Sequence, residues 1–177
     1  MSIVTKRGDQ GKTVLMYNRS VSKCHPRVEV YGAVDELNAA IGLARATAVD
    51  DHLRQNLGAI QDDLVVLMGE LATLNEDLAR YVKDGYQPVT AGMTARLDSL
   101  VEAIEAAEVP ARGWARPGAN PGSAALDVAR TVCRRAERRV CSLRETDQPP
   151  NMEILVYLNR LSDLLWLFAR QSEPKPG

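Results

Sequence analysis

The chain has 177 residues and a mass of 19.4 kDa, with 45% hydrophobic and 25% charged residues. That size and balance are typical of one soluble globular domain, which can bury a sufficient core without a disulfide or a metal. Its 22 Lys and Arg against 23 Asp and Glu give a formal charge of −1, which disfavours a dedicated nucleic-acid-binding protein, because that class usually carries a basic excess.

The first half of the chain predicts an irregular arm followed by two helices. Residues 1–25 contain Gly8, Gly11 and several charges without a sustained period. From Arg27 onward, apolar residues recur every three or four positions, which predicts a helix. A second helix is expected over residues 51–75, where leucines and one isoleucine alternate spacings of four and three, the seam of a left-handed bundle.

The second half predicts three further helices separated by loops. Residues 75–89 have a mixed pattern and are expected to be mostly loop, and a third helix follows Thr90. The proline- and glycine-rich stretch 109–122 predicts a long loop, of a kind that is often functional. We expect Ser123 to cap a fourth helix that reaches Arg144, and Asn151 to cap a fifth over residues 152–170.

The predicted fold class is therefore all-α, a five-helix up-and-down bundle with an irregular N-terminal arm and no strands. The fifth helix is apolar on most sides and is placed centrally. A single domain is expected over residues 1–177. It divides into an arm (1–25), a bundle (26–171) and a tail (172–177).

The cysteine count and the N-terminus bear on the cellular compartment. The three cysteines cannot form a closed disulfide framework, and Cys133 and Cys141, eight residues apart on one predicted helix, are too distant to pair. Reduced thiols are therefore expected. The N-terminus has no apolar signal core, and no stretch is apolar enough to span a bilayer. A cytoplasmic protein with no membrane partner is predicted.

Two segments have the composition of phosphate-binding sites. Residues 5–13 (TKRGDQGKT) combine two glycines, two lysines and two threonines, which suit a phosphate cradle, although their spacing is not that of a Walker A loop. The alternative is a flexible polar arm. Arg130, Arg134 and Arg138 follow at i, i+4 and i+8, so they share one helix face that could bind a triphosphate, with Glu137 beside them. The alternative is a solvated charged face.

Two further segments place polar residues on apolar helices. Asp35 and Asn38 share one face near the apolar stripe of the first helix, where a carboxylate needs a partner and Arg130 is a candidate. A purely structural ion pair is the alternative. Asn159 and Asp163 lie four residues apart on the last helix, where they could fix the bundle register or contact a ligand. Glu-x-x-His pairs, a dispersed-cysteine zinc site and a Gly-x-Ser-x-Gly elbow are not supported by the sequence.

Together these segments resemble, in order and across nearly the whole chain, the ATP:cob(I)alamin adenosyltransferases of the propanediol-utilisation type. The matching segments are residues 5–13, 27–38 (RVEVYGAVDELN), 129–139 (ARTVCRRAERR) and 157–163 (YLNRLSD). The resemblance implies a homotrimer with active sites between subunits. It also implies transfer of the 5′-deoxyadenosyl group of ATP to the cobalt of cob(I)alamin, with Mg²⁺ and ATP bound by one subunit's arm against the basic helix of the next.

The resemblance also assigns roles to individual residues. A nucleotide site is implied for the following residues: Thr5, Lys6, Arg7, Gly8, Asp9, Gly11, Thr13, Lys23, Arg134, Glu137, Arg138 and Asn159. Arg134, Asp35 and Arg130 are the implied catalytic residues. Asp35 and Arg130 would form an inter-subunit ion pair near the corrin. Mg²⁺ would be held mainly by the ATP phosphates.

The cobalamin side of the implied site includes Trp114, Asp35, Arg130 and Asp127. In the family an apolar wall displaces the lower axial ligand of cobalt, and Trp114 stands where that wall has a phenylalanine. Arg116, Asp127 and Arg7 replace an apolar residue, a histidine and a threonine that are usual in the family. A reductase and an adenosylcobalamin-dependent acceptor enzyme are the implied protein partners.

Two other functions compete with the transferase. The first is an ATP- and corrinoid-binding sensor or cofactor escort with weak turnover, which the changed corrin wall would favour. The second is a structural bundle without ligands. Stabilisation by ATP would exclude the second, and only turnover separates the transferase from the sensor.

Overall fold

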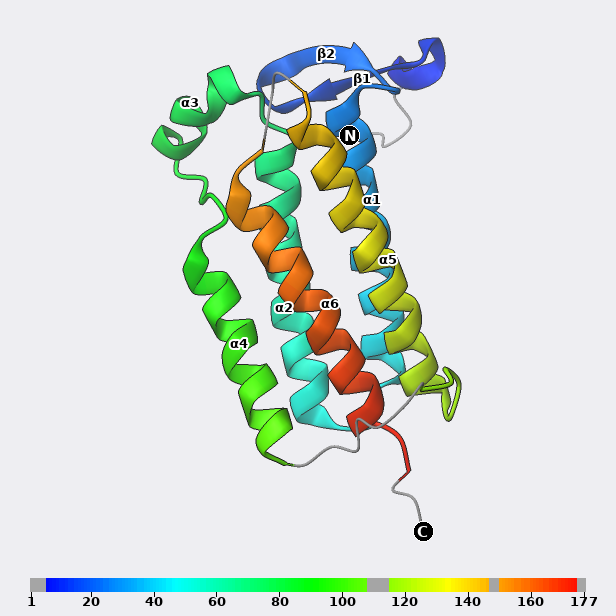
Figure 1. Ribbon diagram of the computed structural model, residues 1–177. Coiled ribbons are helices and arrows are strands. Elements are labelled where there is room, and N and C mark those ends of the chain that lie inside the picture. The colour runs from blue at the N-terminus through cyan, green and yellow to red at the C-terminus, as the bar shows by residue number, and fades with distance from the viewer. Residues whose placement is uncertain (1–5, 108–114, 147–149, 175–177) are drawn as a thin grey trace.

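A computed structural model describes residues 6–107, 115–146 and 150–174. Over these residues the chain forms six α-helices and one small antiparallel hairpin (Figure 1). The helices are α1 (Pro26–Thr47), α2 (Asp51–Leu71), α3 (Leu78–Lys83), α4 (Ala91–Ala106), α5 (Pro121–Arg144) and α6 (Met152–Gln171). The strands are β1 (Lys12–Leu15) and β2 (Arg19–Ser22). Three 3₁₀ helices complete the elements, η1 (Arg7–Gln10), η2 (Met16–Asn18) and η3 (Asn75–Asp77).

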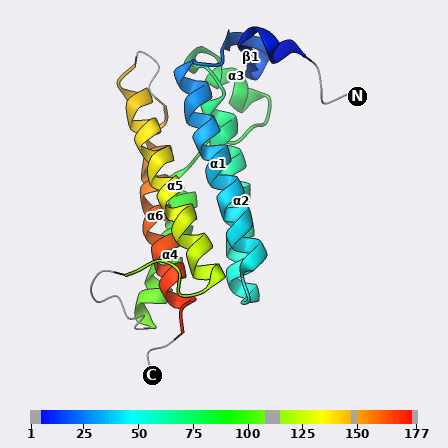
Figure 2. The ribbon, with the colours of Figure 1, turned by 90° about the vertical axis from the view of Figure 1, so that its right-hand side faces the viewer.

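The long helices α1, α2, α4, α5 and α6 alternate in direction along one common axis (Figures 1 and 2). The predicted all-α, up-and-down bundle is therefore confirmed. The arm and α3 lie at the end of the bundle where α1 begins and α5 ends. The start of α5 and the end of α6 lie at the opposite end.

Local signals explain where the helices begin. Asp50 accepts a hydrogen bond from the Leu53 backbone at 2.6 Å and caps α2, and Asn151 accepts one from Glu153 at 3.0 Å and caps α6, as predicted. The cap of α5 is Asn120, three residues before the predicted Ser123. Ser123 instead completes a capping box, in which each side chain bonds the other residue's backbone.

Two segments differ from the sequence prediction. Residues 75–89 contain η3 and α3, and residues 12–22 contain the hairpin β1–β2, although a loop and an irregular arm were expected there. The second helix also ends at Leu71 rather than residue 75. Thr73 and Ala72 bond back to the last turn of α2, so the chain leaves the helix before Leu74.

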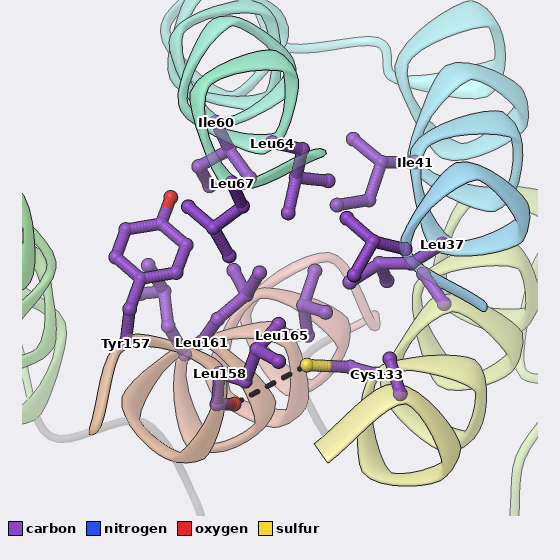
Figure 3. Close-up of a cluster of buried hydrophobic side chains, with 14 of the residues drawn as sticks. Leu37, Ile41, Ile60, Leu64, Leu67, Cys133, Tyr157, Leu158, Leu161 and Leu165 are labelled. Atoms are coloured by element: carbon purple, nitrogen blue, oxygen red, sulfur yellow. Dashed lines mark hydrogen bonds between the residues drawn. The ribbon is translucent and has the colours of Figure 1, made fainter. Parts of the chain in front are cut away.

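The core lies where α6 faces the other long helices (Figure 3). Leu158, Leu161 and Leu165 of α6 are fully buried, as are the seam residues Ile60 and Leu64 of α2. Each such side chain contributes about 1.5–3 kcal/mol when removed from water. The central position predicted for the last helix is confirmed by its eleven buried residues.

The cysteines are free thiols, of which Cys133 alone is buried. The Cys133 Sγ donates to the Leu158 carbonyl at 3.2 Å across α5 and α6, and burial raises the pKa of this thiol (Figure 3). No helix within the described residues is both long and apolar enough to cross a bilayer.

Candidate functional site

The N-terminal arm is closed by hydrogen bonds of its own backbone. Lys6 and Gly11 flank η1 in left-handed conformations, with φ of 57° and 72°. The Gly11 N–H donates to the Gly8 carbonyl at 3.2 Å, and the Lys23 N–H donates to the Gly11 carbonyl at 2.8 Å. This second bond brings the end of the hairpin back to the glycine loop.

Lys23 also contacts the arm through its side chain. A Cβ placed on Gly8 would lie 3.0 Å from the Lys23 Nζ, so glycine leaves space for the ammonium group. The structure thus places Gly8 and Gly11 against Lys23. Lys6 precedes η1, Asp9 lies within it, and Thr13 lies in β1, where it pairs with Val21. Thr5 lies outside the described residues. Arg7 belongs to η1.

The hairpin is held on α3 and η3 by contacts that sequence reasoning missed. Arg19 donates to both carboxylate oxygens of Asp77, at 2.8 and 2.9 Å, and forms an ion pair with Glu76 at 3.0 Å. The Arg80 guanidinium lies 4.2 Å from the centre of the Tyr17 ring. The bond to Arg19 lowers the pKa of Asp77, because it favours the charged carboxylate.

Helix α5 presents its arginines on two sides. Arg135 forms an ion pair with Glu36 of α1, and Arg139 forms one with Glu29 at 3.0 Å. Arg134 and Arg138 are exposed, and their side chains have no hydrogen-bond or ion-pair partner among the described residues. Neighbouring helix positions differ by about 100°. Arg135 and Arg139 therefore join α5 to α1, while Arg134 and Arg138, the available pair, are free to contact a ligand.

A hydrogen bond between α5 and α6 lies close to Arg134 and Arg138 along α5. The Asn159 amide of α6 donates to the Glu137 carboxylate at 3.1 Å, which joins two predicted site residues across the α5–α6 seam. Asn159 and Asp163 are exposed rather than buried. A role in the bundle register and a role in ligand binding both stay predictions for these two residues.

The groove between α1 and α5 forms a pocket of about 160 Å³. Lys23 extends from the arm to its edge, and Gly32 and Ala33 form part of its α1 wall. The paired residues Glu29, Glu36, Arg135 and Arg139 also line it, together with Val28. The N-terminal arm therefore adjoins the α1 side of α5, and neither Arg134 nor Arg138 lines this groove. No hydrogen bond or ion pair joins the arm to these two arginines within the described residues.

The predicted Asp35–Arg130 pair is not formed within the described chain. Asp35 is exposed on α1, whereas the Arg130 Nε donates to Asp127 Oδ1 on its own helix at 3.4 Å. Asp127 is only 4% exposed, and its Oδ2 accepts a hydrogen bond from Arg170 at 2.5 Å. The prediction that Asp35 and Arg130 form a buried ion pair within one chain is therefore wrong. The ion pair between Asp35 and Arg130 of different subunits stays a prediction.

The remaining predicted corrin residue, Trp114, lies outside the described residues. Arg116 is exposed close to the start of α5. A larger pocket of about 490 Å³ lies between α1 and α2, lined by Gly42, Arg45, Ala46, Arg54 and Gln61. None of these residues belongs to a predicted motif. A choice of site by pocket volume alone would therefore have selected this α1–α2 surface rather than the groove beside Lys23.

Comparison with known families gives a match over residues 3–172 to the family model described as cobalamin adenosyltransferase. A corrinoid adenosyltransferase PduO from Salmonella typhimurium is 38% identical over 98% of this chain, which spans about half of that relative's length. A corrinoid adenosyltransferase from Citrobacter freundii is also 38% identical, with 98% of this chain and 96% of the relative covered.

Solved structures of similar proteins have the same fold. A Phe-to-Ala variant of a PduO-type ATP:corrinoid adenosyltransferase from Lactobacillus reuteri, complexed with cobalamin and ATP, superposes with a TM-score of 0.84. The two sequences are 33% identical over 96% of this chain and 92% of that one. An Arg-to-Lys variant complexed with ATP has a TM-score of 0.84 and 32% identity, with 96% and 93% covered.

Proposed function

Because this chain belongs to the cobalamin adenosyltransferase family, we propose that it transfers the 5′-deoxyadenosyl group of ATP to the cobalt of cob(I)alamin. The products are adenosylcobalamin and triphosphate. In this reaction the cobalt electron pair attacks C5′ while the bond from C5′ to the phosphate oxygen breaks. The cobalt pair forms the new Co–C bond, and the triphosphate leaves with the electron pair of the broken C5′–O bond.

The observation that carries the proposal is the pair of unpartnered guanidinium groups at Arg134 and Arg138, beside the bonded Glu137 and Asn159, within the part of the chain that the structure describes. Arginines without carboxylate partners are suited to a leaving group that carries several negative charges. Cob(I)alamin is itself the nucleophile, so the protein needs no activated serine or cysteine. Its task is to orient C5′ in line with cobalt.

The nucleotide arm supplies the other half of the proposed ATP site. Lys6, Gly8, Asp9, Gly11, Thr13 and Lys23 would bind the phosphates, with Thr5 and Arg7 as further arm residues. The backbone closure around Gly8 and Gly11 supports this role, since it directs a small loop and a lysine to one place. Mg²⁺ would be carried mainly by triphosphate oxygens, the hard ligands that this ion prefers.

The position of these residues along α5 supports an ordered arrangement of the two substrates. Arg138 lies nearer the arm and Arg130 nearer the opposite end, with about 12 Å of helix between them. ATP phosphates would lie along Arg134 and Arg138. The corrin would lie toward Arg130, with Asp35, Trp114 and Asp127 in its surroundings.

We propose that each site is completed by a second copy in a homotrimer. The arm reaches the α1–α5 groove through Lys23, which Arg134 and Arg138 do not line. These two arginines share a stretch of α5 with Glu137, which bonds Asn159 of α6. Asp35 is exposed on α1 and lacks a partner within the described chain. Leu43 of α1 and Val128 of α5 are 55% and 50% exposed, and such apolar side chains suit an interface between copies.

An anaerobic absorbance assay tests the reaction. The protein is mixed with ATP, Mg²⁺ and chemically reduced cob(I)alamin, and the expected result is a protein-dependent, light-sensitive adenosylcobalamin spectrum. Heat-denatured protein is the control. Measurable ATP binding without product would overturn the transferase activity and favour a sensor or escort. A cytoplasmic location and links to a reductase and an acceptor enzyme belong to the same proposal.

A further inference from the structure

The buried carboxylate of Asp127 lies between two arginines from different helices. Its Oδ2 accepts from Arg170 Nη2 of α6 at 2.5 Å, and its Oδ1 accepts from Arg130 Nε of α5 at 3.4 Å. The side chains of Asp127 and Arg170 are 5% and 4% exposed, whereas that of Arg130 is 26% exposed. Of the three groups, only Arg130 therefore has a substantial surface open to a ligand or to a second subunit.

The second arginine has further contacts that hold it in place. Arg170 forms an ion pair with Glu173 at 3.0 Å, and its guanidinium lies 5.6 Å from the centre of the Trp166 ring. Close by, the Asn120 amide donates to the Ser172 carbonyl at 2.7 Å, which ties the start of α5 to the end of α6. Arg170 is thus a buried countercharge bonded to one oxygen of Asp127.

We infer that Asp127 is a positioning residue that acts on the corrin substrate through Arg130, and does not contact the corrin itself. This inference rests on the proposed function, which places Arg130 beside cobalamin. With one carboxylate oxygen fixed by Arg170, the other restricts the rotamers that the Arg130 guanidinium adopts. A restricted guanidinium loses less conformational entropy when it pairs with a substrate group or with Asp35 of a second copy.

The burial of Asp127 excludes the simpler interpretation, in which this carboxylate itself binds cobalamin. A side chain that is 5% exposed, with both oxygens bonded to arginines, offers no free atom to a bulky ligand. Substitution of Asp127 by asparagine keeps the shape but supplies only one acceptor oxygen. The amide of that variant could therefore satisfy Arg170 or orient Arg130, but not both.

The test is a double-mutant cycle between Asp127→Asn and Arg130→Ala. The probe is cob(II)alamin, titrated in the presence of saturating ATP and followed by absorbance and electron paramagnetic resonance. Asp127→Asn is expected to raise the Kd for cob(II)alamin about three- to tenfold, in the range for loss of one charged hydrogen bond. The Kd for ATP should stay within about twofold. In the Arg130→Ala background the same substitution should leave the cob(II)alamin Kd unchanged.

Glu173→Gln is the matched control, because it removes a carboxylate from Arg170 without touching Arg130. It should leave the Kd for cob(II)alamin within about twofold of wild type. If Asp127→Asn raises the Kd for cob(II)alamin equally with Arg130 and with Ala at position 130, the role of Asp127 is merely structural and the inference is wrong. The inference is also wrong if this substitution changes the Kd in neither case. A fall in melting temperature alone, without a change in Kd, would have the same meaning.

Separate measurements of cob(II)alamin binding and of adenosylcobalamin formation distinguish failure of the positioning role of Asp127 from failure of the proposed reaction. If the wild type binds cob(II)alamin but forms no adenosylcobalamin, the proposed reaction fails while the cycle still decides the role of Asp127. If the wild type is active and the cycle shows additive losses, the reaction stands and the positioning role is wrong. If cob(II)alamin does not bind to the wild type at all, the positioning role is also wrong.

Discussion

Single residues of α5 divide into those that hold the bundle together and those that remain available for a ligand. Arg135 and Arg139 pair with carboxylates of α1, while their neighbours Arg134 and Arg138 have no partner within the described residues. Exposed ion pairs contribute roughly 0–1 kcal/mol each to stability. Arg134 and Arg138 make no such contribution within the described residues.

Substitution of Arg134 tests this assignment. Arg134→Ala is expected to raise the KM for ATP roughly 10- to 100-fold, because a hydrogen bond to a charged group is worth about 1.5–3 kcal/mol. The melting temperature should not change, since no contact among the described residues is lost. Arg144→Ala is the control, because it removes an exposed arginine from the last turn of the same helix. Equal effects of the two substitutions on KM would contradict a specific role for Arg134.

Sequence patterns located the available residues but not the buried charged ones. The spacing of Arg130, Arg134 and Arg138 was sufficient to predict a common face. Glu137 and Asn159, which the resemblance assigns to the nucleotide site, are hydrogen-bonded to each other. The burial of Asp127 depends on Arg170, which lies 43 positions away on another helix. No local period reports such a contact, because it exists only after α5 and α6 have packed.

Among the elements, the hairpin and α3 are the ones that the sequence did not reveal. Strands of four residues are too short for alternation to stand out, and their turn contains Tyr17 and Asn18 at φ of 59° and 58° rather than a glycine. The six-residue helix α3 has less than two turns of periodicity. The long helices were predicted well because each repeats its apolar stripe over about four or more turns.

The contact between the hairpin and η3, which precedes α3, should control ATP binding. Asp77→Asn weakens the hold of Arg19, so a smaller fraction of molecules has the arm in place, and the KM for ATP is expected to rise about three- to tenfold. The kcat at saturating ATP should change little. Glu76→Gln is the control, because this carboxylate contacts the same arginine but is 61% exposed. A larger effect from Glu76→Gln than from Asp77→Asn would contradict the proposed docking.

The same contact gives the arm a defined pH dependence. Arg19 holds the pKa of Asp77 below its ordinary value of 3.8. The stabilisation is therefore complete above about pH 3.8 and is lost as the pH falls through the lower, folded-state pKa. The difference in melting temperature between wild type and Asp77→Asn should be constant from about pH 5 to 7 and shrink below about pH 3.8. If the difference in melting temperature between wild type and Asp77→Asn instead grows as the pH falls, a titratable group other than Asp77 controls the acid dependence.

At the scale of the whole molecule, the separation of the arm from Arg134 can be tested by mixing subunits. Light scattering should give three times the 19.4 kDa mass of one chain. Lys23→Ala and Arg134→Ala are expected to be poorly active alone. After unfolding and refolding together in equal amounts, about a quarter of the sites should combine an intact arm with an intact basic helix. No recovery of activity would place each site within one chain.

The two sides of α5 also differ in how they should respond to ionic strength. The pairs with Glu29 and Glu36 are half-exposed and add little stability, so their screening by salt costs the fold little. Attraction between Arg134, Arg138 and a highly charged triphosphate is screened much more strongly. Raising NaCl from about 0.05 to 0.5 M should therefore increase the KM for ATP several-fold at a nearly constant melting temperature. Salt would thus weaken ATP binding, as a competing anion does, while leaving the stability of the bundle nearly unchanged.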